Sequence, residues 1–283
     1  MKENTKLLII DGHSLLFQMF FGMPARIIGK NGKAIHGILG FVGAAIKIIK
    51  MVEPTHMVVL FDGEHDNQRS ELSEDYKANR IDYSNVPDEY NPFSQLNDIY
   101  TALDYMGISH TEIADGEADD AIAAYALTYG CKAKIVISSF DSDFFQLINE
   151  NVTILRYRGK KTSFCDSFWI KEQLGISPDV YADFRALTGD AADNIKGADK
   201  VGPKTAAALL KQFGNLKEIL ENSHLIERLL IRNSIDKNAE RLKINYRLIK
   251  LGDGAKMPFD LDKLQFKYNG ITTNMVLEGI GVR

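Results

Sequence analysis

The stretch Leu7-Leu8-Ile9-Ile10-Asp11-Gly12 decides the fold class of this chain. Four apolar residues follow one another without polar alternation, which is typical of a strand that is covered on both faces. Strands of this kind belong to parallel sheets with helices on each side. The run ends in a carboxylate and a glycine, so an acid is expected at the carboxyl end of the strand.

The same pattern recurs along the first half of the chain. Further apolar runs cover residues 57–61, 134–139 and 152–155. The segments between them have helical periodicity, at residues 15–21, 37–51, 93–106 and in the residues that follow Asp120. Alternation of apolar strands with helices predicts the α/β class, with a central, mostly parallel sheet flanked by helices.

The sequence pattern changes near residue 176, from apolar strands alternating with helices to mainly helical periodicity, which suggests two regions. Residues 1–176 are predicted to form the α/β core, which is interrupted by a polar segment at about 64–92. Residues 177–283 are mainly helical, with glycine and lysine in the connections, and we expect a pair of helices at about 180–215 and a C-terminal packing segment.

Composition bounds the class of protein. Of the 283 residues, 45% are hydrophobic and 25% are charged, and the net charge is -4, which is ordinary for a soluble globular chain. Cys131 and Cys165 lack the spacing of metal ligands and favour free thiols in a reducing cytoplasm. The longest apolar segment, residues 34–52, contains charged side chains and is not expected to span a membrane. We therefore expect a cytoplasmic protein with no secretory signal.

Acids follow three of the predicted strands. Asp11 and Asp62 end two of them, and Asp141 with Asp143 comes directly after a third. The carboxyl ends of parallel strands meet at one edge of the sheet, where the functional crevice of an open α/β fold lies. One acid there is common and structurally neutral, but acids after three strands favour a functional site.

A denser group of acids lies in Gly116-Glu117-Ala118-Asp119-Asp120, at the start of a predicted helix. The helix dipole favours one or two acids in a first turn. Three close carboxylates repel one another unless cations are bound. Asp190 and Asp193 add two more acids after a short helix in the second region.

The acids predict a magnesium or manganese centre. Oxygen ligands without histidine or cysteine partners suit Mg²⁺ or Mn²⁺ rather than Zn²⁺. So many carboxylates exceed one Mg²⁺, whereas two ions about 3.5–4 Å apart would use them to clamp an in-line displacement at phosphorus. The sequence therefore predicts metal-dependent phosphodiester hydrolysis, with the ligands Asp11, Asp62, Glu117, Asp119, Asp120, Asp141, Asp143, Asp190 and Asp193.

Residues 197–205 nearly match the nucleotide-binding loop G-x-x-x-x-G-K-[ST], but Pro203 separates the second glycine from Lys204 and no strand precedes. A turn capped by Gly202, with proline at the first helical position, explains the stretch better. The free N–H groups of such a helix start can bind a phosphate together with Lys204 and Thr205. An ordinary helix start is the alternative interpretation.

Two weaker motifs remain. Asp141-Ser142-Asp143 is compatible with a haloacid-dehalogenase-type phosphotransferase, but Phe145 stands where that class has threonine. The basic run from Arg156 to Lys161, with Tyr157 interleaved, has the pattern of a nucleic-acid-binding face, with a solvated hairpin as the competing interpretation.

In order and spacing, the motifs resemble the flap-endonuclease-like 5′ nucleases, which include the 5′–3′ exonuclease domain of bacterial DNA polymerase I and stand-alone bacterial and phage 5′–3′ exonucleases. The resemblance covers about residues 6–250. It rests on Ile10-Asp11-Gly12-His13-Ser14-Leu15-Leu16, Phe61-Asp62-Gly63, Tyr76-Lys77-Ala78-Asn79-Arg80, Gly116-Glu117-Ala118-Asp119-Asp120, Ser139-Phe140-Asp141-Ser142-Asp143, Gly189-Asp190-Ala191-Ala192-Asp193-Asn194 and Val201-Gly202-Pro203-Lys204-Thr205-Ala206.

The resemblance implies a PIN-like nuclease core and a helix–three-turn–helix element near residues 180–215, where main-chain carbonyls hold K⁺ and the backbone of duplex DNA binds. It also implies roles for single residues. The first metal would be held by Asp11, Asp62, Glu117 and Asp119, and the second by Asp141, Asp143, Asp190 and Asp193. Asp119 would lie between the ions, and Asp120 would support them. Arg69, Lys77 and Arg80, in the arch or gateway formed by residues 64–92, would contact the scissile phosphate and the single-stranded 5′ end. Gly202, Lys204 and Thr205 would contact the duplex.

Two positions depart from the family pattern. Gln18 stands where polymerase-associated members usually have arginine, and Lys200 replaces the first glycine of the usual Gly-x-Gly turn. The nine acids are all present.

The function implied by the resemblance is that of a structure-selective 5′–3′ exonuclease or flap endonuclease. Such an enzyme hydrolyses DNA near single-strand/double-strand junctions by a two-metal-ion mechanism and leaves 5′-phosphate products. Its partners would be DNA with 5′ flaps, nicks, gaps or free 5′ ends, bound by a monomer in the nucleoid during replication or repair. Two alternatives remain open: a non-catalytic DNA-junction-binding protein on the same fold, and a PIN-type ribonuclease.

Overall fold

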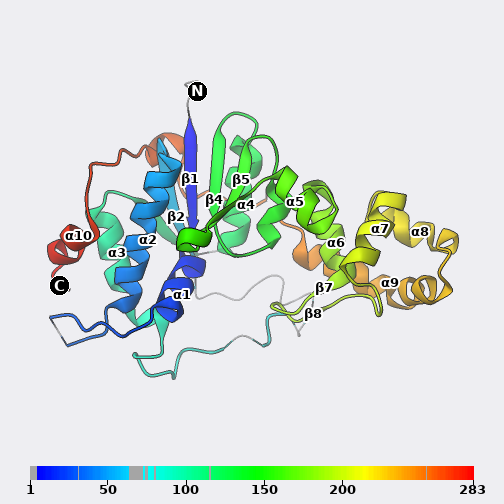
Figure 1. Ribbon diagram of the computed structural model, residues 1–283, viewed down its shortest axis with the longest axis horizontal. Helices are drawn as coiled ribbons and strands as arrows, with labels where there is room; N and C mark the ends of the chain where they lie inside the picture. The colour runs from blue at the N-terminus through cyan, green and yellow to red at the C-terminus, as the bar shows by residue number, and fades with distance from the viewer. Residues whose placement is uncertain are drawn as a thin grey trace.

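The computed structural model describes residues 5–30, 32–63, 73, 76–79, 81–114, 116–252 and 254–283. Its main sheet has the strand order β3-β2-β1-β4-β5-β6, in which β6 alone runs antiparallel to its neighbour (Figure 1). The strands are β1 (Lys6–Asp11), β2 (His56–Asp62), β3 (Ser109–Ile113), β4 (Lys134–Ser138), β5 (Val152–Arg156) and β6 (Ser163–Cys165).

Helices cover both faces of this sheet, which explains the unbroken apolar runs. Successive residues of a strand point to opposite faces. Leu8 and Ile10 of β1 therefore pack into one core and Leu7 and Ile9 into another. The first core contains residues from α1 (Gly12–Gly22), α2 (His36–Val52), α3 (Leu96–Tyr105) and α10 (Thr273–Gly279). The second contains α4 (Ala118–Tyr129) and extends into the helical region.

The helical region extends to one side of the sheet (Figure 1). It consists of α5 (Ser167–Leu174), α6 (Tyr181–Thr188), the hairpin strands β7 (Gly189–Asp190) and β8 (Ile195–Lys196), α7 (Pro203–Phe213), α8 (Leu216–Glu221) and α9 (Leu229–Ile249). The long helix α9 packs against α6, and α6 also packs against α7. The short β7–β8 hairpin lies between α6 and α7, so the expected pair of helices near 180–215 is present.

A close approach at Gly12 brings the first two strand ends together. A Cβ atom at this residue would lie 2.3 Å from the ring of Phe61 in β2, so any side chain there would displace that ring. The glycine that follows Asp11 thus allows α1 to start directly against β2, beside Asp62.

The predicted fold class is confirmed: a central, mostly parallel sheet is flanked by helices. Sequence patterns missed β3, because its residues Ser109–Ile113 are largely polar and form an edge strand. The predicted helix at 93–106 is a 3₁₀ turn, η1 (Pro92–Gln95), followed by α3. In the part of the chain that the structure describes, no helix combines the length and the apolar character needed to cross a bilayer.

Candidate metal centre

Three predicted acids lie at one edge of the sheet. The strands β2, β1 and β4 are direct neighbours and parallel. Asp62 and Asp11 are the last residues of β2 and β1, and Asp141 follows β4 by three residues. The expectation that these acids meet at the carboxyl edge is confirmed, because all three line a single cavity of about 1100 Å³.

Asp11 is fixed by hydrogen bonds. Its Oδ1 accepts from the backbone N–H of Ser14 at 3.0 Å, as the N-cap of α1, and its Oδ2 accepts from the Ser139 hydroxyl at 2.7 Å. Burial raises the pKa of Asp11 to about 6 in spite of these two hydrogen bonds, and the nearby charges of Asp62 and Asp141 act in the same direction. The side chain is 7% exposed, so its charge lacks the screening that water would provide.

Asp62 is held differently. Its Oδ1 accepts from the N–H of Ala118, the first residue of α4, at 2.8 Å, and its Oδ2 lies 3.4 Å from Nδ1 of His13. Burial favours a higher pKa for Asp62, but the hydrogen bonds from His13 and Ala118 outweigh it and lower the pKa below its ordinary value. The start of α4 and the end of β2 are thus joined by one carboxylate.

Asp119 faces the same cavity from the first turn of α4. Burial raises its pKa well above the ordinary value, and the charges of Asp141, Asp62 and Asp11 add to the shift. Four carboxylates therefore line one space, where burial and their mutual repulsion both disfavour the charged form of Asp119.

Two further acids, Glu117 and Asp120, stand at the start of α4. Glu117, the N-cap residue of the helix, is 4% exposed and forms an ion pair with the ammonium of Lys77. Lys77 has a φ of +56°, and its backbone N–H donates to the carbonyl of Asp193 at 3.1 Å. Asp120 is partly buried in the first turn of α4. Among the described residues, neither Glu117 nor Asp120 lines the cavity.

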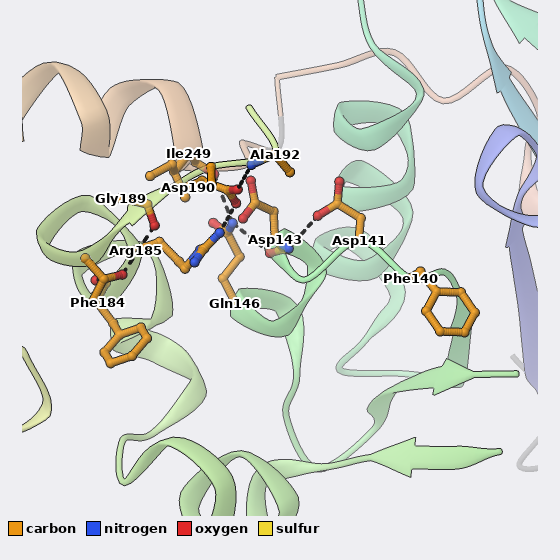
Figure 2. Close-up of polar contacts among 12 residues, drawn as sticks. Phe140, Asp141, Asp143, Gln146, Phe184, Arg185, Gly189, Asp190, Ala192 and Ile249 are labelled. Carbon is orange, nitrogen blue, oxygen red and sulfur yellow. Dashed lines mark hydrogen bonds and ion pairs between the residues drawn. The ribbon is translucent and has the colours of Figure 1, made fainter. Parts of the chain in front are cut away.

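The remaining acids come from the segment after β4 and from the β7–β8 hairpin. Asp143 starts the 3₁₀ helix η2 (Asp143–Leu147), and its N–H donates to Oδ1 of Asp141 at 2.7 Å. Figure 2 shows Asp190 beside Asp143, with α6 packed against η2. Asp190 forms an ion pair with Arg185 and accepts from the N–H of Ala192 at 2.8 Å. Asp190 and Asp193 are each 8% exposed.

The donors fit a hard divalent cation, although they do not form a closed ligand shell. Within the described residues, no three histidine, cysteine, aspartate or glutamate side chains stand close enough to share one ion. The cavity presents carboxylate oxygens, the ligands preferred by Mg²⁺ and Mn²⁺. A cation would also offset the burial and the repulsion that together raise the pKa of Asp119.

The start of α7 has the predicted form. Gly202 is its N-cap residue, and Pro203 occupies the first turn. Gly202 and Lys204 are exposed and Thr205 is partly exposed, so this helix end faces solvent. Lys200, in the turn before it, has a φ of +64°, a left-handed conformation that favours glycine.

Side chains of α9 form hydrogen bonds to the β7–β8 hairpin and its flanking residues, which sequence patterns had not indicated. Asn245 donates to the carbonyl oxygens of Ala186 and Lys196 at 3.1 and 3.0 Å. Arg241 donates to the carbonyl of Gly197 at 2.8 Å. Gly189, with a φ of +82°, lies so close to Gly197 that an added Cβ would be 2.5 Å from its nitrogen.

Two of the three cations predicted for the arch, Arg69 and Arg80, lie outside the described residues. The described part of segment 64–92 consists of turns and irregular chain up to η1. His13 and Arg185, which contact predicted ligands, were not singled out from sequence.

Aromatic side chains form another wall of the acidic cavity, where Phe17, Tyr83 and Phe93 meet edge to face.

Comparisons with known proteins agree with this architecture. Residues 6–175 match the model of the 5′–3′ exonuclease N-terminal resolvase-like domain, and residues 176–271 match the 5′–3′ exonuclease C-terminal SAM fold. A 5′–3′ exonuclease of Aquifex aeolicus is 32% identical over 266 residues, which cover 92% of this chain and 86% of that protein. DNA polymerase I of Streptococcus pneumoniae is 32% identical over 271 residues, or 93% of this chain and 30% of the polymerase.

The chain thus spans less than a third of the length of the DNA polymerase I relatives that it matches. Among solved structures, the bacteriophage T5 flap endonuclease with DNA and metal ions has a TM-score of 0.73 at 22% identity, over 98% of this chain and all of that one. The catalytic core of Rad2 with DNA substrate has a TM-score of 0.60 at 19% identity, over 98% and 85% of the two chains. These likenesses concern the fold. Two family models and a relative matched along most of its length assign the chain to the 5′–3′ exonuclease family.

Proposed function

We propose that this protein is a structure-selective 5′–3′ exonuclease and flap endonuclease that hydrolyses DNA phosphodiesters near single-strand/double-strand junctions. One observation carries the proposal: Asp11, Asp62, Asp119 and Asp141 line one cavity at the carboxyl edge of the sheet. The pKa of Asp119 is raised by burial and by these three neighbours, so the cavity is suited to receive divalent cations. Membership of the 5′–3′ exonuclease family supports the same activity.

The division of the acids between two ions is the one that the family resemblance implies, and of these acids Asp11, Asp62, Asp119 and Asp141 line the cavity. Asp11, Asp62, Glu117 and Asp119 would hold a first Mg²⁺ or Mn²⁺, and Asp141, Asp143, Asp190 and Asp193 a second, with Asp119 between them and Asp120 in support. Bound ions of this kind supply Lewis-acid stabilisation of the phosphorus centre and an activated water. Solved structures of the T5 5′-exonuclease with divalent metal ions support metal dependence.

The chain's own residues would bind and orient the substrate strand. Lys77, which neutralises Glu117 in the structure, carries a cation close to the acids and would bind the scissile phosphate. Arg69 and Arg80 would do so with it from the arch. The aromatic wall of Phe17, Tyr83 and Phe93 suits the faces of unpaired bases.

Residues 177–283, the second of the two predicted regions, would bind the duplex through the helices up to α9, whereas α10 packs on α2 and α3 of the core at 1–176. The exposed N-terminus of α7 offers N–H groups to a backbone phosphate, with Lys204 and Thr205 alongside. We propose in addition that main-chain carbonyls of the turn before α7 hold a K⁺ ion that helps to bind the duplex backbone. Contacts to phosphates make affinity fall steeply with salt and give selectivity for structure rather than sequence.

A cleavage assay tests the function. The purified protein is incubated with 5′-flap, nicked and gapped DNA duplexes, with Mg²⁺, Mn²⁺ or EDTA, and the lengths and 5′ ends of the products are determined. We expect cleavage near the junction, with 5′-phosphate ends, only with the metal. Binding without cleavage under every metal condition would instead support a non-catalytic junction binder, and preference for an RNA flap would support a PIN-type ribonuclease.

Asp119→Ala is the matched site test. Loss of the central ligand removes several kcal/mol of metal-supplied stabilisation, so the cleavage rate should fall about 10³-fold or more. Binding of the 5′-flap duplex, measured by fluorescence anisotropy, should change little. Cleavage at near the wild-type rate would show that Asp119 does not lie between the ions.

A further inference from the structure

The basic run that begins at the last residue of β5 has members that face inward and members that are exposed. Arg156 points inward: its guanidinium donates to the carbonyl of Phe140 at 2.9 Å and lies 4.7 Å from the centroid of the Phe145 ring. Tyr157 is 7% exposed. These two residues hold the start of the β5–β6 turn, which we define as residues 157–162. They are not available to a ligand.

The other cations of the turn face solvent. Arg158, Lys160 and Lys161 are exposed, and none of them forms an ion pair within the described residues. The Arg158 guanidinium lies over the Phe140 ring, 4.7 Å from its centroid. A cation on an aromatic face keeps its donors free while losing part of its conformational freedom. The short 3₁₀ helix η3 (Gly159–Lys161) adds the two lysines beside it.

The topology brings this turn to the catalytic edge. Strand β5 is the parallel neighbour of β4, so the turn leaves the sheet at the edge where Asp141 follows β4. Adjacent strands are about 4.8 Å apart, so the segments that carry Arg158 and Asp141 start from neighbouring strand ends at that edge. In Figure 2, Phe140 lies beside Asp141 on the side away from Asp143, and its ring points away from the Asp141 carboxylate.

One hydrogen bond joins Phe140, the residue under Arg158, to the cavity wall, and another joins the turn itself to the same helix. The N–H of Phe140 donates to Oγ of Ser14, a residue that lines the cavity. The Gln18 side-chain amide donates to the carbonyl of Tyr157, directly before Arg158. Both Ser14 and Gln18 belong to α1, whose N-cap residue is Asp11. The position of Arg158 is therefore coupled to the helix that Asp11 caps.

On the basis of the proposed function, we infer that Arg158, with Lys160 and Lys161, forms a phosphate-binding site for the substrate DNA strand beside the acidic cavity. The site takes phosphates that neighbour the reacting one, because Phe140, which carries Arg158 on its ring, lies on the side of Asp141 that faces away from Asp143 and Asp190. The exposed cations offset the repulsion between the acidic cavity and the DNA backbone. Arg158 is thus a positioning residue for the substrate, and Gln18 holds its turn in place.

Equilibrium binding tests this assignment without chemistry. A fluorescent 5′-flap duplex is titrated with protein in EDTA at several salt concentrations, and anisotropy gives the dissociation constant. Arg158→Ala should weaken binding about tenfold, the equivalent of one charge-assisted hydrogen bond. The slope of log affinity against log salt should decrease by about 0.7–0.9, as for one lost phosphate contact. Lys160→Ala combined with Lys161→Ala should act in the same direction.

A charge-matched control removes two lysines elsewhere. Lys47→Ala with Lys132→Ala takes away two exposed cations, one on α2 and one just before β4, at the opposite edge of the sheet. This control should leave both affinity and salt slope near the wild-type values. An equal loss in the control would mean that net charge alone acts, which would overturn a site at the turn.

The variant Arg158→Lys separates charge from structure. It should recover most of the affinity and the salt slope, while the melting temperature of all three turn variants stays near that of the wild type. Weak binding by both Arg158→Lys and Arg158→Ala together with a lowered melting temperature would make the role structural and overturn the inference. Wild-type affinity in Arg158→Ala would overturn it alone, whereas absence of DNA binding by the wild type would remove the proposed function as well.

Discussion

The acids at the sheet edge and the acid of the β7–β8 hairpin are stabilised in opposite ways. Asp11 and Asp62 accept hydrogen bonds from Ser14, Ser139 and Ala118, and they form no ion pair with lysine or arginine within the described residues. Asp190 instead has an internal cation, since Arg185 pairs with it.

The two regions differ in the source of the positive charge that balances their carboxylates. Burial raises the pKa of Asp119, and the charges of its neighbours raise it further, because hydrogen bonds orient a carboxylate without removing its negative charge. A paired arginine neutralises the charge of a carboxylate, but the carboxylate oxygens that it contacts are then not open to a metal ion. The sheet edge is therefore arranged for a cation from outside, while the hairpin is neutralised from within until its arginine is displaced.

The largest expected effect comes from neutralising one acid of each kind. In EDTA at pH 7.5, Asp190→Asn should lower the free energy of unfolding by about 2–3 kcal/mol, because Arg185 would remain largely buried without its partner. Asp119→Asn should raise it by roughly 1 kcal/mol, because repulsion with its three neighbours is removed. Urea denaturation of both variants measures these changes of opposite sign.

A double variant provides the control. Arg185→Met together with Asp190→Asn removes both charges, so much of the stability lost in the single variant should return. If Asp119→Asn and Asp190→Asn shift stability in the same direction, the contrast between the two regions is wrong.

The pH dependence of the metal-free protein is the next effect. Because the folded-state pKa of Asp11 is about 6 against an ordinary value of 3.8, folding favours its protonated form. This contribution is fully present below pH 3.8 and is lost as the pH rises through 6. It amounts to about 2–3 kcal/mol for Asp11. Added Mg²⁺ should restore stability at pH 8 and have little effect near pH 4.5, because protons then compete with the ion.

Urea denaturation at both pH values, with EDTA or with Mg²⁺, measures this linkage. Ca²⁺-free buffers and a matched ionic strength exclude simple screening. A Mg²⁺ effect that is equally large at both pH values would contradict the assignment of the buried acids as its ligands.

The smallest effect concerns the turn before α7. Lys200→Gly relieves a left-handed backbone conformation, worth about 1 kcal/mol, but glycine also gains freedom in the unfolded chain. The free energy of unfolding should therefore change by less than about 1 kcal/mol, in the stabilising direction. Lys211→Gly, at an exposed helical position of α7, is the control and should destabilise by about 1 kcal/mol. Equal losses in both variants would show that the Lys200 side chain itself supports the turn.

Prediction from sequence succeeded where a local pattern is enough. Apolar runs located β1, β2, β4 and β5 within about a residue at either end, since strands buried on both faces need apolar residues throughout. The turn at Gly202 and Pro203 was predicted from the backbone requirements of a helix start. The polar edge strand β3 was missed, because pairing with β2 and not its own composition makes it a strand.

The candidate site was predicted only in part, for a similar reason. Acids at strand ends could be expected to converge, because parallel strands in one sheet end at one edge. The pairing of Lys77 with Glu117 and of Arg185 with Asp190 depends on how the helical region packs against the core. The same holds for Asn245 and Arg241, which fasten the hairpin loop from α9, more than 40 residues away along the chain.

The sequence by itself thus determined the α/β class, the strands that end in carboxylates, the family and the chemistry of the donors, because these follow from residue type and short-range spacing. Tertiary structure alone decided which acids share the cavity, which are neutralised by an internal cation, and which members of the basic run face solvent. These properties depend on distances between side chains from separate elements, and the electrostatic energy of a charge changes with each of those distances and with its burial.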